Sequence, residues 1–146
     1  MQKRTIANDI FMSEVTRLIS EGSKVTFTPK GVSMLPFIRG NRDSVVLTSP
    51  KDLQKIDIVL AKIGDIYVLH RIIDIQGDKL KLMGDGNVVG VEYCTREDVI
   101  AWVESIIKDG KEYDCRSRKH HLKAKIWWLL RPLRRYMLAI YRRLFL

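Results

Sequence analysis

Short runs of β-branched residues, separated by turn signals, occupy the chain between residues 24 and 114. The runs read VTFTP, DSVVLTS, DIVLAKI, IYVLHRIIDI, KLKLMG and VIAWVESII. Gly-Asn, Ser-Pro, Gly-Asp and Asp-Gly pairs stand between them, and such pairs are typical of turns. Regularly spaced short strands with tight turns favour a mostly β fold, built as a compact antiparallel barrel or sandwich.

A helix is predicted on each side of this β region. Residues 8–21 have apolar side chains at helical spacing, with Asn8 as the expected N-cap and Gly22 as the stop. From about Leu122 onward, apolar residues recur again at three- and four-residue steps, and Pro132 must bend this second helix or start a new one. We therefore divide the chain into an N-terminal helix (1–23), a β domain (24–115) and a helical tail (116–146).

The tail carries the positive charge of the chain. The net charge of the 146 residues is +9, yet the last acidic residue is Asp114, and ten Lys and Arg follow it. A local basic field attracts anionic membranes, nucleic acid or acidic partner surfaces. Because Trp, Leu and Phe alternate with Arg, the tail also has the pattern of a helix that lies in a bilayer interface.

The predicted partners of the tail are an anionic membrane surface or another protein. The alternative is that its apolar stripe packs on the β domain or on a second copy, with solvated arginines. The sequence has no secretory signal and no apolar run of about 18 residues that could span a bilayer. We expect a cytoplasmic protein, peripheral at the inner membrane face.

The remaining composition argues against metal and cofactor chemistry. Cys94 and Cys115 do not make a disulfide framework, and we expect both to be reduced and structural. His120 and His121 stand alone, without the spacing of a metal site. The Gly84-x-Gly86 pair precedes a turn rather than a helix, so it is not a nucleotide loop. No cofactor is expected.

Three stretches of the β region carry candidate chemistry. In GVSMLPFIRGNRD, Ser33 follows a strand on a turn, where a hydroxyl can be exposed and backbone N–H groups can face an oxyanion. In YVLHRII, His70 is the one histidine of the β region, and an imidazole can take a serine proton near neutral pH. In MGDGN, Asp85 lies in a turn, where it serves the turn itself or orients His70.

Together these stretches resemble the conserved boxes of type I signal peptidases. GVSMLPFIRGNRD is similar to the S-x-M-x-P box, DIVLAKIGDIYVLHRII to the box that ends in His-Arg, and LMGDGN to the later G-D-x-N box. The order and the spacing agree, and the resemblance covers about residues 24–115. It implies a mostly β fold that is shared with self-cleaving LexA-like repressors.

The resemblance implies a serine endopeptidase of the Ser-His branch. Ser33 would be the nucleophile and His70 the general base, while Gly31, Met34 and Pro36 would shape the wall that binds peptide or leader substrates. Substrates would have small residues before the cut. Where many relatives have a serine that helps the oxyanion, this chain has Gly31, so the oxyanion would rely on backbone N–H groups.

The acid that orients His70 is left open by the sequence. Ser-His relatives have a second aspartate about six residues after that of the G-D-x-N box, and here the matching place lies near Val91. Asp85 is the first candidate, Glu92 is the second, and the third reading has no orienting acid.

Two other functions remain. The missing second aspartate is compatible with an inactive relative that binds peptides without cleaving them. The basic tail and the shared fold are compatible with a LexA-like regulator that binds nucleic acid. The predicted N-terminal helix is too short for a helix-turn-helix domain, and the repressors use Lys where this chain has His70, so nucleic acid is the less favoured partner.

Overall fold

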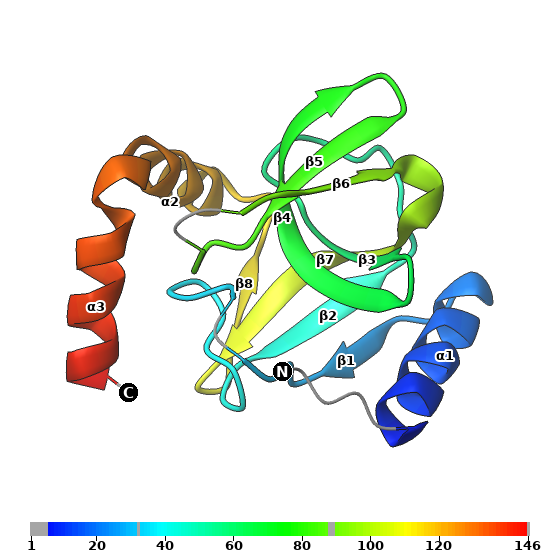
Figure 1. The fold of residues 1–146 in the computed structure, drawn as a ribbon. Helices are drawn as coiled ribbons and strands as arrows, with labels where there is room; N and C mark the ends of the chain where they lie inside the picture. The colour runs from blue at the N-terminus through cyan, green and yellow to red at the C-terminus, as the bar shows by residue number, and fades with distance from the viewer. Residues whose placement is uncertain (1–5, 32, 88–89, 146) are drawn as a thin grey trace.

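The computed structural model of the 146-residue chain describes residues 6–31, 33–87 and 90–145 (Figure 1). The elements in chain order are α1 (Ile6–Ser20), β1 (Val25–Phe27), β2 (Ser44–Thr48), β3 (Ile58–Ile63), β4 (Ile66–Gln76), β5 (Lys79–Met83), β6 (Glu92–Thr95), the 3₁₀ turn η1 (Arg96–Asp98), β7 (Val99–Lys108), β8 (Lys111–Asp114), α2 (Arg118–Leu129), the 3₁₀ turn η2 (Arg131–Leu133) and α3 (Arg134–Phe145).

The strands form one antiparallel sheet in the order β1-β2-β7-β3-β4-β5-β6, and β8 pairs with β7. Figure 1 shows the sheet curled into a half-barrel, with α1 on one side and the tail helices α2 and α3 on the other. The predicted mostly β fold with a helix at each end is confirmed.

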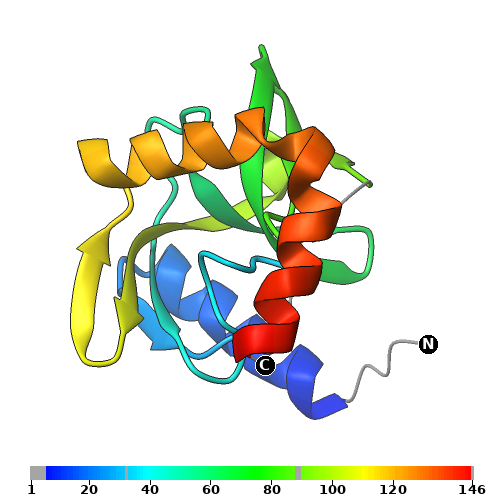
Figure 2. The same cartoon turned by 90° about the vertical axis from the view of Figure 1, so that its left-hand side faces the viewer.

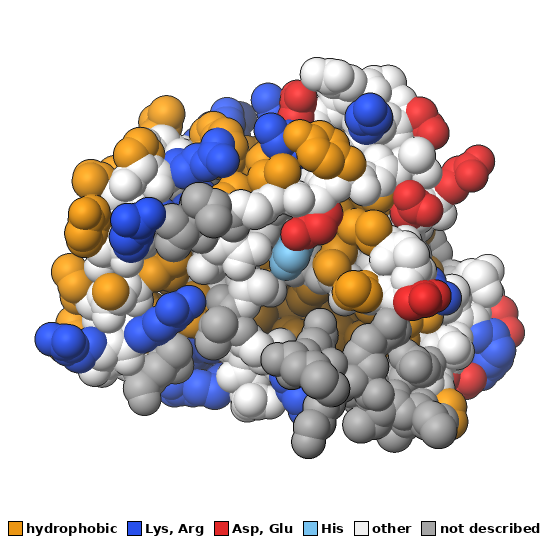
Figure 3. Space-filling model, viewed as in Figure 1, with side chains coloured by type: hydrophobic (Ala, Val, Ile, Leu, Met, Phe, Trp, Pro, Cys, Tyr) orange, Lys and Arg blue, Asp and Glu red, His pale blue; other side chains and the backbone are white. Residues whose placement is uncertain are grey.

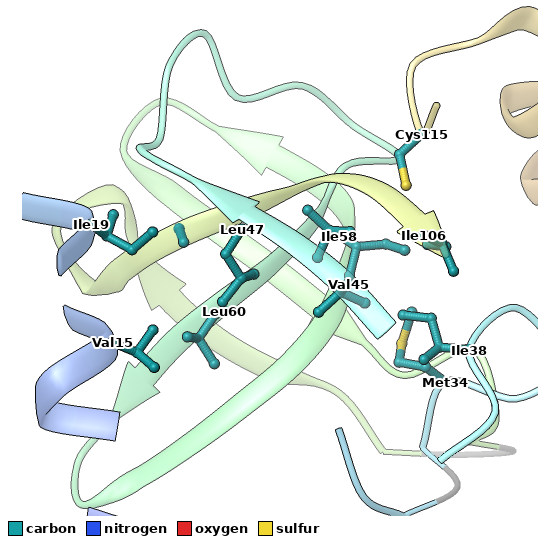
Figure 4. Packing of buried hydrophobic residues seen from close by; sticks show 12 residues of the cluster. Val15, Ile19, Met34, Ile38, Val45, Leu47, Ile58, Leu60, Ile106 and Cys115 are labelled. Carbon is teal, nitrogen blue, oxygen red and sulfur yellow. The ribbon is translucent and has the colours of Figure 1, made fainter. Parts of the chain in front are cut away.

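Most of the hydrophobic core lies inside the curl of the sheet. Figure 4 shows Val15 and Ile19 of α1 packed near Leu47 and Leu60, while Met34 lies at the opposite end of the same cluster. This core therefore connects α1 with Met34, the residue that follows the candidate nucleophile, Ser33.

Strand β3 is buried on both faces, which explains its continuous apolar run. Ile58 and Leu60 join the cluster inside the curl, whereas Val59 and Ala61 join a second cluster that includes Trp102. A strand covered on both sides lacks the alternation of polar and apolar residues seen in half-exposed strands.

The tail packs on the β domain through one face of each helix. His120, Ala124 and Trp127 of α2 are buried, and so are Arg134 and Leu138 of α3. Figure 2 shows the two helices as an L across one side of the molecule, with the bend at η2, where Pro132 was expected to interrupt the helix.

The ends of several elements differ from the sequence-based expectation. The first helix begins at Ile6, so Asn8 lies inside it and is not the N-cap. The tail helix begins at Arg118 rather than near Leu122, because the Ser117 hydroxyl caps it by accepting the His120 amide N–H at 3.1 Å. Among the described residues, no helix is long and apolar enough to cross a membrane.

Candidate active site

Ser33 begins a tight turn whose following residues are buried in the protein. The amides of Phe37 and Ile38 both donate to the Met34 carbonyl oxygen at 2.9 Å. Met34, Leu35 and Ile38 are each at most 4 % exposed. The apolar residues that follow Ser33 therefore anchor the turn, and the serine stands at its beginning.

Two close backbone approaches and one buried carboxylate hold the loop that contains this turn. The Asn41 amide donates to the Pro29 carbonyl at 2.8 Å, and a Cβ added at Gly40 would lie 1.9 Å from the Gly31 carbonyl oxygen. Glycine is thus required at position 40, because the backbone at Gly40 and the backbone at Gly31 are in contact there. At the end of the loop, Asp43 is fully buried and accepts hydrogen bonds from Arg39 and Lys108.

The ionised form of the Asp43 carboxyl is favoured over the protonated form. Burial raises the pKa of the Asp43 carboxyl, but the hydrogen bonds from Arg39 and Lys108 outweigh burial and hold the pKa below its ordinary value. Asp43 is therefore ionised at neutral pH and ties the end of the serine loop to β7.

Ser33 lines a small hollow of about 30 Å³. The other lining residues are Pro29, Lys30, Gly31, Met34, Ile38, Gly40 and Leu69. Gly31 and Met34, two of the three residues expected to shape the substrate wall, thus lie beside Ser33. Pro36, the third, is not part of this lining.

His70 comes to the serine turn through the register of β4 and β5. Arg71 pairs with Met83 across these strands, so His70 lies opposite Gly84, immediately after β5. A Cβ added at Gly84 would lie 2.3 Å from the Ser33 carbonyl oxygen and 3.1 Å from Cδ2 of His70. The Ser33 carbonyl oxygen and the His70 imidazole therefore both lie against the Cα of Gly84, on the side where a side chain would stand.

The loop after β5 is bound directly to the serine turn. The Gly86 amide donates to the Ser33 carbonyl oxygen at 2.7 Å, and the Asp85 amide contacts the Met34 sulfur at 3.4 Å. The G-D-G-N sequence thus holds the serine turn through its backbone, a role that does not depend on the Asp85 carboxylate.

Glu92 is the acid that contacts His70. Its carboxylate Oε1 forms a short hydrogen bond with Nδ1 of the imidazole. Glu92 begins β6, the strand next to β5, and its side chain is 30 % exposed, whereas that of His70 is 10 % exposed. Figure 3 shows a histidine side chain beside a carboxylate in a hollowed part of the surface, with hydrophobic side chains next to them.

Asp85 does not contact His70 as the first candidate was expected to do. Its carboxylate oxygens accept hydrogen bonds from Nε and Nη2 of Arg71 at 2.8 and 2.7 Å. Both side chains are 5 % exposed. The reason is the alternation of β4, where successive side chains point to opposite faces. Arg71 therefore points away from His70 and holds Asp85 on its own side.

The Arg71–Asp85 pair is covered by the tail. The Arg71 Nη1 group donates to Nε2 of His120 at 3.1 Å, and the Trp127 indole donates to the Asp85 carbonyl oxygen at 2.7 Å. The pKa of His120 is lowered to about 3, mainly by burial and to a smaller extent by the positive charge of Arg71. His120 is therefore neutral at pH 7, as an acceptor for Arg71 must be.

The tail also reaches the serine turn itself. Leu35 packs in one cluster with Trp127 and Leu138, and the Arg134 guanidinium donates to the Asn87 carbonyl oxygen at 3.2 Å. Arg134 is 2 % exposed, so it is not one of the solvated arginines that the pattern of the tail predicted.

The cysteines are not alternative nucleophiles. Both are free and buried. Burial raises the pKa of Cys94 to about 11 and that of Cys115 to about 12. Since the thiolate is the reactive form, both remain inert thiols at neutral pH.

No protein-family model matches the chain, and no curated protein matches its sequence.

Replacement of Gly84 with Ala tests whether this loop holds the serine beside the histidine. The added Cβ would overlap the Ser33 carbonyl oxygen, which belongs to the backbone and cannot rotate away. We expect labelling of Ser33 by a fluorophosphonate probe to slow by at least about tenfold, because small misplacements of reacting groups are costly. The measurement is the rate at which the probe labels the protein, compared at one temperature and one probe concentration.

Gly64→Ala is the matched control for this substitution. A Cβ at Gly64 meets no atom within 4 Å. Because φ is +61° there, an alanine is strained and should lower the free energy of unfolding by about 1 kcal/mol, with no effect on the labelling of Ser33. Equal labelling rates for Gly84→Ala and the wild-type protein would show that the loop does not position Ser33.

Proposed function

We propose that the protein is a serine endopeptidase in which Ser33 is the nucleophile, His70 the general base and Glu92 the residue that orients the base. The observation that carries the proposal is the position of the His70 ring, with Glu92 on Nδ1 and the Ser33 peptide beside Cδ2. A carboxylate on Nδ1 leaves Nε2 as the nitrogen that can accept a proton.

In the proposed reaction, Ser33 Oγ attacks the scissile carbonyl carbon while its proton passes to Nε2 of His70. The tetrahedral intermediate then expels the amine, which takes that proton, and an acyl-enzyme ester remains. Water, activated by His70, hydrolyses the ester and restores the serine. Glu92 would stabilise the imidazolium that forms in each half of the reaction.

The oxyanion donors in this proposal are backbone N–H groups. Within the described residues, the amides of Ser33 and Met34 donate to no acceptor. Gly31 has no side chain to offer a further donor, and its φ of +95° places the chain in a conformation that glycine adopts without strain. Backbone donors of this kind stabilise the negative oxygen of the intermediate.

The Ser33 hydroxyl has no hydrogen bond to His70 or to another described residue in the structure. Catalytic hydrogen bonds are often long before substrate binds and tighten in the reacting complex. The missing contact is, however, the feature that favours the second candidate function, in which the same site binds peptides without cleaving them.

The test is a comparison of new protein N-termini in cells that make the wild-type chain or Ser33→Ala. We expect termini that depend on Ser33, with small residues before the cut, and covalent labelling of Ser33 by a fluorophosphonate probe. His70→Ala should lose both signals while retaining the fold. Identical termini and no labelling of the wild-type chain would contradict the peptidase assignment and leave peptide binding.

A further inference from the structure

The outer side of the tail exposes a row of large apolar side chains. The residues are Leu122, Ile126 and Leu129 of α2, then Leu133, Met137, Ile140 and Leu144, from the η2 bend through α3. Their exposed fractions run from 38 % to 77 %. In each helix they recur at three- and four-residue steps, so they form one stripe. We call this stripe the apolar face of the tail.

The apolar face is distinct from the side that packs on the β domain. In α2 the buried residues are His120, Ala124 and Trp127, which are out of phase with Leu122 by half a helical turn. In α3 the buried Leu138 packs with Leu35, and the buried Arg134 donates to the Asn87 carbonyl oxygen. The fold therefore uses one side of the tail and leaves the apolar face uncovered.

Exposed basic side chains lie on both sides of the apolar face in α2, where they are Arg118, Lys119, Lys123 and Lys125. In α3, Arg143 lies beside the apolar face, whereas Arg135 and Arg142 lie on the opposite, exposed face of the helix. No acidic residue follows Asp114 in the sequence, so none of these charges has a neutralising partner within the tail. Figure 3 shows blue and orange side chains together along the left edge, over the tail helices.

The two tail helices lie on the same side of the β domain. Figure 2 views that side directly and shows α2 and α3 lying in front of the β domain, at an angle to each other. Two helices joined at a bend cover an area rather than a line. This geometry suits a flat, extended partner more than a single groove or strand.

The charge and the apolar face together select the partner. A second copy of the chain would bring two like-charged surfaces together, which is unfavourable. A nucleic acid would satisfy the arginines but would give the seven apolar side chains nothing to pack against. An anionic bilayer offers negative headgroups to the basic residues and hydrocarbon to the apolar face at the same time.

We propose that the apolar face of the tail and its flanking basic residues dock on the surface of an anionic lipid bilayer. The helices lie in the interface, with the apolar face toward the acyl chains. Docking depends on the outer side of α2 and α3 and not on the chemistry of Ser33, so it can be tested apart from the proposed peptidase.

The test is flotation of the full-length protein with vesicles. One set contains only phosphatidylcholine, and the other contains about 30 % phosphatidylglycerol, which gives an anionic surface. We expect binding to the anionic vesicles alone, weakened when salt is raised to about 0.5 M because salt screens the headgroup charge. Ser33→Ala should bind as the wild-type chain does, whatever its effect on cleavage.

Two sets of variants separate charge from apolar contact. Lys119→Gln, Lys123→Gln and Lys125→Gln together should weaken partition about a hundredfold. The matched control removes three exposed charges from the β domain, by Lys51→Gln, Lys79→Gln and Lys111→Gln, and should bind normally. Circular dichroism verifies that each variant is folded.

The apolar contribution has its own pair of variants. Leu129→Ser with Ile140→Ser should weaken partition by at least about tenfold, since each loses a buried side chain in the bilayer. Ile66→Ser with Tyr113→Ser removes exposed apolar groups from the β domain and should have no effect. Equal binding to both vesicle types, no binding, or a dimer that forms through the apolar face in solution would each overturn the proposal.

Discussion

Replacement of Glu92 with Gln is expected to slow the acylation of Ser33 by about 10²- to 10⁴-fold, the range seen when the acid of a serine triad loses its charge. Glu92 contacts Nδ1 of His70, and an amide in its place cannot stabilise the imidazolium ion that forms as Ser33 attacks. The amide can also favour the wrong tautomer of the ring. The measurement is the rate of fluorophosphonate labelling, together with kcat/KM on a peptide that spans an identified cleavage site.

Glu97→Gln is the control for this prediction. Glu97 is an exposed carboxylate in the η1 turn after β6, so its substitution removes the same charge without touching His70. The labelling rate should stay within about twofold of the wild-type rate. A Glu92→Gln variant that reacts at the wild-type rate would remove Glu92 from the mechanism and leave His70 without an orienting acid.

Replacement of Arg71 with Met is expected to lower the free energy of unfolding by about 3–5 kcal/mol, because it leaves Asp85 as a buried charge without its partner. The loss includes the hydrogen bonds of Arg71 to the Ile56 carbonyl oxygen and to His120. Urea unfolding at pH 7, followed by circular dichroism, measures the change.

The matched control breaks an exposed ion pair of the same type. Arg17 pairs with Glu14 and Glu21 on the surface of α1, where side chains are about half exposed. Exposed pairs contribute little to stability, so Arg17→Met should leave the free energy of unfolding nearly unchanged. A cost of less than about 1 kcal/mol for Arg71→Met would mean that Asp85 is solvated or neutralised in some other way.

The outcome for the orienting acid shows the limit of sequence reasoning at this site. Ser33 and His70 could be chosen because their residue types and their places in the strand pattern suit the chemistry. Between Asp85 and Glu92, the match of MGDGN to the G-D-x-N box placed Asp85 first. The choice is made by tertiary contacts: Arg71 takes Asp85 on one face of β4, and β6 brings Glu92 to the other.

The same limit applies to the secondary structure. Strands β1 to β5 and β7 could be predicted because each lies in a run rich in β-branched residues that is bounded by turn signals. Strands β6 and β8 were missed, since the sequences EYCT and KEYD contain little apolar or β-branched character. Their pairing depends on β5 and β7, which a local pattern does not contain.

The tail shows a third kind of difference. Its amphipathic pattern was visible in the sequence, but the pattern alone did not tell which side packs inward. Arg134 looks like any other basic residue of the tail, yet it is buried and donates to the Asn87 carbonyl oxygen. Its position follows from the bend at Pro132, which turns α3 across the serine turn.

The indole of Trp127 joins two parts of the molecule that a boundary at residue 115 would separate. Through the Asp85 carbonyl oxygen, it connects the outermost helices to the loop that holds Ser33. If a ligand that shifts α2 changes the affinity of the serine site for its own ligand, the serine-site ligand must change the affinity at α2 by the same factor. A shortened chain ending before α2 would lose this link and leave Leu35 facing water.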